Sequence, residues 1–522
     1  MESMVDSNYS LGSLPELFQN LGQVVVCKQD GDLAMDIADL EEIVDRLCQG
    51  LEEWGAKPGD RIAVWLPNGV PYIALMWATS RLGLVLVSIN TRYRSSEVAD
   101  IVGRSGARLL VVDPGFLGIN FRGILAEIKQ SDLLLEGVIS LDDNIELTWP
   151  TIRWSDLIRS ERSSIDRSDR DLPWIVFSTS GTTSQPKLVL HNQSGPADHA
   201  RDLAPTFGQV AMAAVPMCGV FGYSMLLGAM GAGSDLITMP IFDADLTGTA
   251  IEKYGVNTFH GSDEMLARII QVGTDLSSLD AVGYARFNNA LENVPEDAAK
   301  AGLNAIGLYG MSEVHALYSR RSLQPKEKMS IPGGSLASVE ASARVVDPDT
   351  NKVLGIGEEG ELQLRGPSLF AGYLANGGED IDSTLTSKHF DYDWFKTGDL
   401  ARMEDEVTFE YLARLGDVLR LGGFLVNPAE IEECLLSQEG VNAVQVVGVD
   451  LSSGPKAVAF VVSEQTIDAQ KLRTECRSRL ASFKVPALII QLKEFPTTES
   501  ANGTKIQKVR LRDIAIEALS NN

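Results

Sequence analysis

A hydroxyl-rich loop that ends in a lysine is the segment of this chain best suited to phosphate chemistry. It runs from Phe177 to Lys187 as Phe-Ser-Thr-Ser-Gly-Thr-Thr-Ser-Gln-Pro-Lys and follows the apolar stretch 174–176. Hydroxyl and backbone N–H groups donate to phosphate oxygens, glycine permits close backbone approach, and lysine supplies a mobile cation. Taken alone, the loop is as typical of a Ser/Thr-rich surface turn. It indicates a phosphate site only if other motifs support it.

Better-known motifs do not explain the loop. The Walker A spacing G-x-x-x-x-G-K-[ST] is absent, which removes the main support for a P-loop ATPase. Ser184 and Lys187 match the S-x-x-K pattern of serine acylases, but a proline stands where that motif requires helix. A G-x-G-x-x-G match at 355–360 precedes the strand-like run 361–364 instead of a helix, so we do not expect a dinucleotide site there.

The elements that must position the loop alternate between short strands and helices. Apolar runs at 61–67 and 84–90 flank the helix-length stretch 70–82, and similar runs recur farther along the chain, at 109–112, 210–215, 236–239 and 305–308. This alternation predicts an α/β fold of layered, mostly parallel sheets. Ligands in such folds bind at the carboxyl ends of the strands.

The pattern changes after about residue 330. Shorter strands broken by Gly, Asp and Pro predict antiparallel sheet, which we expect as a β-barrel-like subdomain of the large body. The last hundred residues read as helix, strand, strand and helix, at 427–434, 443–449, 456–462 and 468–480. We therefore expect an N-terminal body over residues 1–416 and a small, mobile α+β domain over residues 417–522.

Composition excludes several classes of protein. The 522 residues carry a net charge of -26, which opposes binding to nucleic acid or to an anionic membrane. The five cysteines are scattered and contain no C-x-x-C pair, so neither a disulfide framework nor a zinc site is expected. The start of the chain lacks the features of a signal peptide, and no apolar run reaches about 18 residues. We expect a cytoplasmic protein without a membrane span.

Several further motifs, in order, make the chain resemble one family. The loop 177–187 is similar to the signature of the adenylate-forming superfamily, which includes acyl-CoA synthetases, luciferases and nonribosomal adenylation domains. The other motifs with this resemblance are 59–68, 83–90, Gly307-Leu308-Tyr309-Gly310-Met311-Ser312-Glu313, 360–373, Trp394-Phe395-Lys396-Thr397-Gly398-Asp399, Arg414-Leu415-Gly416-Asp417 and Gly503-Thr504-Lys505-Ile506-Gln507-Lys508. Together they cover roughly residues 40 to 512.

The resemblance implies a nucleotide site. Tyr309 would pack on the adenine, Asp399 and Arg414 would contact the ribose, and Ser312 would reach the α-phosphate. Glu313 and Thr182 would bind Mg²⁺, whose preference for oxygen ligands suits both. The positions implied in ATP and AMP binding are Thr179, Ser180, Gly181, Thr182, Thr183, Lys187, Asn289, Ala290, Leu308, Tyr309, Gly310, Met311, Asp399 and Arg414.

The resemblance also implies roles near the C-terminus. Lys505 would stabilise charge as a carboxylate attacks the α-phosphate, with Glu313 and Ser312 as the other catalytic residues, whereas Lys508 reads as a solvated charge. Asp417 matches the family's hinge position. Coenzyme A would meet the glycine loop formed by Arg420, Gly422, Gly423 and Phe424, although by itself this loop is typical of a tight turn.

By the same placement, the acid would bind in a largely apolar pocket. Its expected lining comprises Met217, Cys218, Phe221, Met225, His260 and Gly261, which predicts an aliphatic or aryl acid. His260 could mark a polar group of the substrate, but a structural role is favoured for it. Gly219 stands where many relatives carry His, and Ser184 and Leu188 replace common glycines. No Asp-plus-Lys pair is positioned to hold a zwitterion, which disfavours amino-acid activation.

The expected function is an acid:CoA ligase that uses ATP and Mg²⁺ to form an acyl-adenylate and then passes the acyl group to coenzyme A. Two alternatives stay open. One is an adenylating enzyme that loads a separate carrier protein, and the other is a catalytically silent relative that binds nucleotide or acyl ligand. The expected partners are a small carboxylic acid, ATP and CoA, and a homodimer is compatible with the resemblance.

Overall fold

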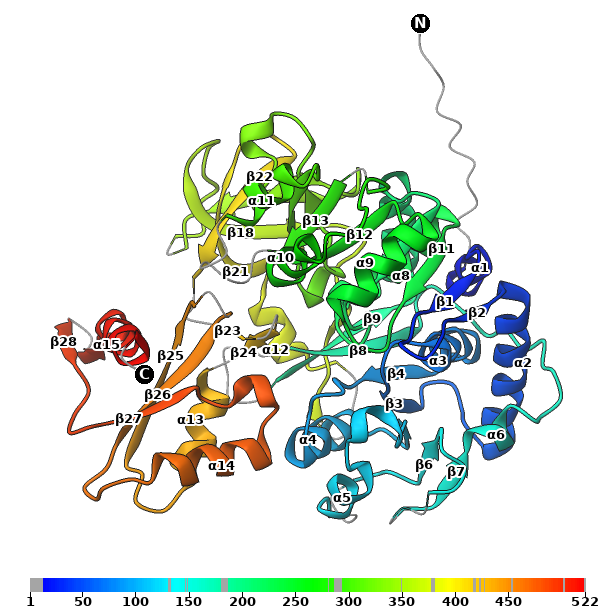
Figure 1. The fold of residues 1–522 in the computed structure, drawn as a ribbon, viewed down its shortest axis with the longest axis horizontal. Coiled ribbons are helices and arrows are strands. Elements are labelled where there is room, and N and C mark those ends of the chain that lie inside the picture. The colour runs from blue at the N-terminus through cyan, green and yellow to red at the C-terminus, as the bar shows by residue number, and fades with distance from the viewer. Residues whose placement is uncertain are drawn as a thin grey trace, which may run out of the picture.

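The computed structural model describes most of the chain (Figure 1). The described residues are 13–129, 133–145, 147, 149–179, 186–279, 281–285, 293–348, 350–376, 381–415, 419–421, 424–426, 428–451, 454–500 and 503–520. They form two large sheets with helices around and between them, followed by a small C-terminal domain. The predicted α/β class, with a large N-terminal body and a small C-terminal domain, is confirmed.

The first sheet has eight strands, of which the central ones are parallel and buried on both faces. Runs of Val, Leu and Ile suit this position, because a parallel sheet covered on both sides has no polar face. In spatial order the strands are β19 (Gly372–Tyr373), β9 (Lys187–Asn192), β8 (Pro173–Thr179), β4 (Val85–Ser88), β3 (Arg61–Trp65), β5 (Leu109–Val112), β6 (Gly137–Ser140) and β7 (Thr151–Arg153).

The second sheet has fourteen strands and changes from parallel to antiparallel at β14 (Ala305–Tyr309). Its parallel part contains β1 (Val24–Val26), β11 (Asp235–Thr238), β10 (Val210–Ala213), β12 (Thr258–Ser262) and β13 (Ala281–Ala285). At its edge, β2 (Leu33–Met35) pairs with β1 in the antiparallel direction. The antiparallel part contains β15 (Ser319–Arg320), β16 (Gly333–Leu336), β22 (Thr408–Arg414), β21 (Trp394–Met403), β18 (Glu359–Arg365), β17 (Ser342–Val346) and the short β20 (Phe390–Asp391).

The antiparallel strands differ from our expectation in one respect. We expected a β-barrel-like subdomain, but among the described strands they form an open continuation of the parallel sheet. The physical reason lies at β14, the last parallel strand. β15 pairs with its outer edge and β16 pairs with β15, so the hydrogen-bonded sheet continues instead of closing into a separate barrel. Sheet continuity of this kind is a tertiary property that strand lengths and turn residues do not encode.

Apolar helices fill the space between the two sheets. α3 (Val70–Leu82) and α8 (Val220–Ala232) are buried over most of their length and share one core with strands of both sheets. A helix that is apolar all round needs such a position. α7 (Ser194–Leu203) packs closely on α8, which requires glycine at position 231. A Cβ at Gly231 would lie only 1.9 Å from the carbonyl oxygen of Ala200.

The remaining helices of the body cover the outer faces of the sheets or connect their strands (Figure 1). They are α1 (Leu14–Gln19), α2 (Ile37–Trp54), α4 (Ser95–Ser105), α5 (Phe121–Ala126), α6 (Trp154–Leu157), α9 (Ala244–Tyr254), α10 (Asp263–Val272), α11 (Val294–Lys300) and α12 (Ser383–Lys388). None of the helices in the described ranges combines the length and apolarity that a membrane crossing requires.

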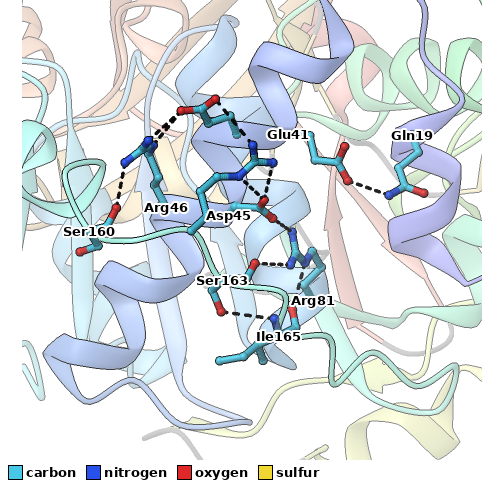
Figure 2. Close-up of polar contacts among 10 residues, drawn as sticks. Gln19, Glu41, Asp45, Arg46, Arg81, Ser160, Ser163 and Ile165 are labelled. Atoms are coloured by element: carbon cyan, nitrogen blue, oxygen red, sulfur yellow. Dashed lines mark hydrogen bonds and ion pairs between the residues drawn. The ribbon is translucent and has the colours of Figure 1, made fainter.

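Paired charges join α2 and α3 to the segment 160–165 (Figure 2). The guanidinium of Arg81 donates to Asp45 at 2.6 Å and to the carbonyl oxygens of Ser163 and Ile165 at 2.9 and 3.0 Å. Arg162 donates to the other oxygen of the Asp45 carboxylate at 2.8 Å. We call Asp45, Arg81, Arg162 and these two carbonyls the Arg81 network.

The small domain contains a three-stranded sheet and three helices. Its elements are β23 (Leu419–Leu421), β24 (Phe424–Val426), α13 (Pro428–Leu436), β25 (Ala443–Val449), β26 (Lys456–Val462), α14 (Ala469–Arg479), β27 (Leu488–Leu492), β28 (Thr497–Ser500), β29 (Gly503–Ile506) and α15 (Lys508–Ser520). The order of helix and strand follows the sequence-based expectation for 427–480. All five cysteines of the chain are free thiols.

A buried lysine connects the small domain to α4 of the body. Lys484 Nζ lies 2.8 Å from Glu97 Oε1 of α4 and 2.6 Å from Glu430 Oε2 of α13, and its side chain is 4 % exposed. Ser96 Oγ also donates to the carbonyl oxygen of Arg479 at 2.6 Å. Figure 1 shows the small domain beside α4. Both halves of the molecule can therefore contribute to one cavity.

Candidate active site

A cavity of about 1160 Å³ lies where the two sheets and the small domain meet. The carboxyl ends of β8 and β14 open into it, as expected for a ligand site in a parallel α/β fold. The sequence-predicted positions among its lining residues are Thr179, Lys187, Cys218, Phe221, Leu308, Tyr309, Gly310, Met311, Ser312, Glu313 and Asp399. Segments far apart in the chain thus meet in one volume.

A buried carboxylate is held on one wall of the cavity. Asp399 is 2 % exposed, and its Oδ2 accepts a hydrogen bond from the hydroxyl of Tyr309 at 2.7 Å. The backbone N–H of Asp399 donates to Thr397 Oγ1 at 3.0 Å. Phe409 meets the Tyr309 ring edge-on, with ring centroids 5.1 Å apart. Asp399 and Tyr309 are therefore oriented before any ligand arrives.

Arg414 lies directly opposite Asp399 in the ladder of β21 and β22. Cross-strand neighbours of this kind point to the same face of a sheet. The backbone register therefore puts both implied ribose-binding positions at one place, although the side chain of Arg414 lies outside the described part of the structure.

A second polar group surrounds Lys187 at the start of β9. Its ammonium Nζ lies 2.6 Å from His389 Nε2 and 4.8 Å from the centre of the Tyr373 ring. The Tyr373 hydroxyl donates to Glu313 Oε1 at 2.9 Å, and Glu313 is 7 % exposed. These contacts connect the lysine of the phosphate loop with the carboxylate implied in metal binding. His389 was not among the predicted site residues.

The backbone that carries Ser312 and Glu313 has an unusual shape. His315, Ala316 and Leu317 have φ angles of 58°, 53° and 38°, a region that non-glycine residues rarely adopt. Hydrogen bonds stabilise the segment: the N–H of Phe370 donates to the carbonyl of Glu313 at 2.8 Å, and the N–H of Ala316 donates to that of Met311 at 2.9 Å. The surrounding structure thus fixes where Glu313 points.

Three buried histidines lie beneath this segment. His191 Nε2 donates to the carbonyl oxygen of Ser312 at 2.8 Å, and the rings of His191 and His315 lie 3.7 Å apart between centroids. The His199 ring lies 5.8 Å from that of His315. Burial lowers the pKa of His191 to about 3 and that of His199 to about 4, and lowers the pKa of His315 strongly. We call these three residues the histidine cluster.

No sequence motif pointed to the histidine cluster. Its members are three of only five histidines in the chain, which is the one sequence signal that set them apart. Because they come from β9, α7 and the segment after Glu313, only the packing of these elements brings them together.

The structure places two of the six residues expected in the acid pocket at the cavity. Cys218 and Phe221 line the cavity together with Pro240, Ile241, Phe242 and Met265, which the sequence did not single out. Met217, Met225, His260 and Gly261 are buried and are not among the described lining residues. His260 Nδ1 lies 3.1 Å from the N–H of Gly283, and burial lowers its pKa to about 4. This environment suits the structural role weighed for His260.

Other predicted positions lie outside the described residues or side chains. Ser180, Gly181, Thr182, Thr183, Asn289, Ala290, Asp417, Gly422 and Gly423 are outside the described residues. For Arg420, Phe424 and Lys505 the backbone alone is described, and Lys505 pairs with Thr498 between β29 and β28. Their roles stay predictions.

Layered, largely parallel sheets with a cavity of mixed polar and apolar lining at the strand ends define an α/β protein with a candidate ligand site large enough for a nucleotide. The chain belongs to the AMP-binding enzyme family, whose model matches residues 21–374, while the model of the AMP-binding enzyme C-terminal domain matches residues 430–502.

Individual relatives are similar over nearly the whole chain. The mitochondrial medium-chain acyl-CoA ligase ACSF2 of Mus musculus is 25% identical over 92% of this chain and 83% of its own length. The long-chain-fatty-acid–CoA ligase FadD13 of Mycobacterium tuberculosis is 26% identical over 92% and 93%. The solved o-succinylbenzoate CoA synthetase of Bacillus subtilis superposes with a TM-score of 0.81 at 22% identity, covering 96% of this chain and 98% of that one.

Proposed function

We propose that this chain is an AMP-forming acid:CoA ligase. In the first half reaction, a carboxylate oxygen of the acid attacks the α-phosphorus of ATP, and pyrophosphate leaves with the electron pair of the broken P–O bond. In the second half reaction, the sulfur of coenzyme A attacks the acyl carbon of the acyl-adenylate and AMP leaves. Similarity to two fatty acid CoA ligases along most of the chain supports this choice of thiol.

The observation that carries the proposal is the meeting of three kinds of group in one cavity. The buried carboxylate of Asp399 suits two ribose hydroxyls, because a carboxylate only accepts hydrogen bonds and has room for several. Lys187 and Thr179 line the same cavity and suit phosphate oxygens. The apolar residues Phe221, Phe242 and Met265 suit the body of an organic acid.

Each of the polar residues proposed for the site would have a separate role in binding ATP or in forming the acyl-adenylate. Asp399 and Tyr309 hold the nucleoside, and Lys187 with the hydroxyl-rich loop holds the β- and γ-phosphates. Ser312 reaches the α-phosphate. Lys505, delivered by the small domain, stabilises the charge that develops there. One cation aimed at a developing oxyanion contributes about 10²–10³ in rate, if measured oxyanion-hole mutations are a guide.

Mg²⁺ fits the donor set that the site offers. Among the described residues no group of three or more His, Cys, Asp or Glu side chains could hold a metal by itself. Mg²⁺ however is usually bound through one or two carboxylates together with substrate phosphates. Glu313, oriented by Tyr373, is such a carboxylate, and Thr182 is the second proposed ligand. When bound, the ion would neutralise phosphate charge during the first half reaction.

Coenzyme A would enter from the side of the small domain. Glu430, Ser482, Phe483 and Lys484 of that domain line the same cavity as Glu313 and Asp399. We propose that the domain turns about Asp417 between the half reactions and presents the loop of Arg420, Gly422, Gly423 and Phe424 to the pantetheine arm. This turn would break the contacts of Lys484 with Glu97.

We propose a hydrophobic acid as the substrate, either a medium- to long-chain fatty acid or an aryl acid. The apolar residues that line the cavity include Cys218, Phe221, Ile241, Phe242 and Met265. Burial raises the pKa of the Cys218 thiol to about 11, so this residue contributes an uncharged surface. The charged residues Glu264 and Arg268 also line this part of the cavity, with the Arg268 guanidinium 5.0 Å from the centre of the Phe242 ring. The apolar side chains favour an apolar acyl group, since burying a polar group without a partner is costly.

The test is acid-dependent release of pyrophosphate from ATP and Mg²⁺, measured over a panel of short to long fatty acids and aryl acids. We expect release with hydrophobic acids and formation of acyl-CoA when coenzyme A is added. Lys505→Ala should lower adenylation about 10²–10³-fold, and Lys508→Ala, the matched control three residues away, should change it less than about threefold.

Three outcomes would revise the proposal. Release that yields a thioester only with a phosphopantetheinyl carrier protein would indicate an adenylating enzyme that loads a separate carrier. Nucleotide binding without acid-dependent release would indicate a silent relative. Equal losses in Lys505→Ala and Lys508→Ala would refute the assignment of the catalytic lysine.

A further inference from the structure

His389 is the closest described partner of Lys187, yet no motif includes it. It caps the C-terminus of α12, and its ring is linked to that helix through Nδ1, which lies 3.0 Å from the carbonyl oxygen of Leu385. Its Nε2 lies 2.6 Å from the ammonium of Lys187. Both residues line the cavity.

The two contacts determine the state of the ring. A carbonyl oxygen can only accept, so Nδ1 carries the proton toward Leu385, and an ammonium can only donate, so Nε2 presents its lone pair to Lys187. The imidazole is therefore neutral and in a single tautomer. Burial, the largest cause, lowers the pKa of His389, and the cations of Lys187 and Lys396 lower it further, whereas the hydrogen bond to Leu385 and the carboxylate of Glu313 oppose this shift.

The backbone on both sides of His389 is also anchored. Its N–H donates to the carbonyl of Thr386 at 3.0 Å, and its own carbonyl accepts from the N–H of Lys396 at 2.7 Å. The edge of the ring packs on Tyr373, with centroids 5.1 Å apart at an angle of 70°. A ring fixed in this way defines one direction in space for its lone pair.

A neutral acceptor has a consequence that a carboxylate would not have. An Asp or Glu at this distance would cancel the charge of Lys187 and repel an incoming phosphate. Imidazole can orient the ammonium without adding a negative charge of its own. The face of Tyr373, 4.8 Å from Nζ, adds attraction for a cation without adding a negative charge.

We propose that His389 is a positioning residue for Lys187, which aims the charged ammonium of the phosphate loop at the polyphosphate of ATP. This role rests on the proposed adenylation reaction. His389 does not touch the reacting atoms, and it acts by removing the conformational freedom of a long side chain before the nucleotide binds.

The first test needs no substrate. In the ligand-free full chain labelled with ¹⁵N-histidine, the His389 resonances are identified by their absence in His389→Gln. At pH 8 we expect a neutral ring protonated on Nδ1, and we expect Lys187→Met to shift the Nε2 resonance, since it removes the donor. A ring protonated on Nε2, or an Nε2 resonance that ignores Lys187→Met, would overturn the proposal even if the enzyme proved inactive.

The second test is a double-mutant cycle on pyrophosphate release. We expect His389→Phe to raise the KM for ATP about tenfold with a smaller fall in kcat, and His389→Gln, whose amide oxygen can accept from Lys187, to recover most of that loss. In the Lys187→Met background, His389→Phe should have almost no further effect, because the two residues act as one unit.

The outcomes separate this inference from the proposed function. If the wild type releases pyrophosphate and the effects of the two substitutions multiply, His389 does not act through Lys187 and the inference is wrong. If the wild type is inactive with every acid while the histidine spectra agree, the contact stands and the reaction assigned to the chain is what fails.

Discussion

The Arg81 network and the polar groups of the cavity wall differ in the contacts that their charged side chains make. The polar groups of the cavity wall are Asp399, Tyr309, Lys187 and His389. In the Arg81 network the side chain of Arg81 is 9 % exposed and that of Asp45 is 14 % exposed, and opposite charges contact one another directly. On the cavity wall, Asp399 is paired with the neutral hydroxyl of Tyr309, and Lys187 contacts the neutral ring of His389. In the first region the contacts join opposite charges, whereas in the second these two contacts join a charged group to a neutral one.

The histidine cluster also differs from the Arg81 network, because its buried side chains have no counter-charge beside them in the described part of the chain. Its rings pack on one another and on the segment that carries Ser312, with no carboxylate beside them among the groups that shift their pKa values. A cluster of this kind supports the site only while it is uncharged. In the Arg81 network, by contrast, charged groups stabilise one another by direct contact.

The largest expected effect is therefore a loss of stability in mild acid. The pKa of His191 is about 3 and that of His199 about 4 in the folded chain, below the ordinary value of 6.5. As the pH falls through 6.5, the unfolded chain takes up protons that the folded chain does not. The free energy of unfolding should fall by up to about 1.4 kcal/mol per histidine per pH unit, or roughly 4 kcal/mol for the cluster between pH 7.5 and 5.5.

The measurement is the pH dependence of the denaturation midpoint between pH 7.5 and 5.5. His199→Gln should reduce proton uptake on unfolding by about one at the acid end, and this difference cancels opposing contributions such as Asp202, whose pKa burial raises to about 6. Equal proton uptake in both proteins would show that His199 titrates normally in the folded state. In His199→Gln, the contribution of His191 to this loss of stability should continue down to about pH 3.

The next effect in size is the removal of the buried partner of Asp45. Arg81→Ala should lower the free energy of unfolding by about 3 kcal/mol, because it removes one of the two arginines that pair with a mostly buried carboxylate and leaves two backbone carbonyls without their donor. Chemical denaturation measures the loss. Adenylation by the folded protein should be unchanged.

Arg162→Ala is the matched control for the same carboxylate. The Arg162 side chain is 53 % exposed, so its loss should cost less than about 1 kcal/mol. Equal losses for the two arginines would mean that burial does not decide the strength of this network.

The smallest expected effect concerns the cavity wall. Asp399→Asn keeps an oxygen that can accept from Tyr309 but removes the negative charge, and hydrogen bonds to a charged acceptor are about twice as strong. We expect kcat/KM for ATP to fall about 10- to 10²-fold with little change in stability. Asp393→Asn, an exposed aspartate six residues away that pairs with Arg365, should leave kcat/KM unchanged. If the free energy of unfolding fell by more than the free energy that corresponds to the loss of kcat/KM, the main role of Asp399 would be to stabilise the fold.

The sequence located the predicted site residues best where they belong to one short motif. The runs 307–313 and 394–399 each place their functional side chain at the end of a strand or inside one, so their local pattern is visible in the chain. It was least successful where contacts come from separate elements. The four expected pocket residues that lie away from the described lining were assigned by position in a motif, and the packing of α8 and β12 decided which of their neighbours face the cavity.

By itself, the sequence determined the α/β class, the division into a large body and a small domain, and the positions of Tyr309, Glu313, Lys187 and Asp399, because strand and helix periodicity and short motifs are local properties. Only the tertiary structure decided the continuous fourteen-stranded sheet, the histidine cluster and the contact of Lys187 with His389. Lys187 and His389 are 202 residues apart in the chain. Their contact depends on how β9, β19 and α12 pack, and no local preference encodes that arrangement.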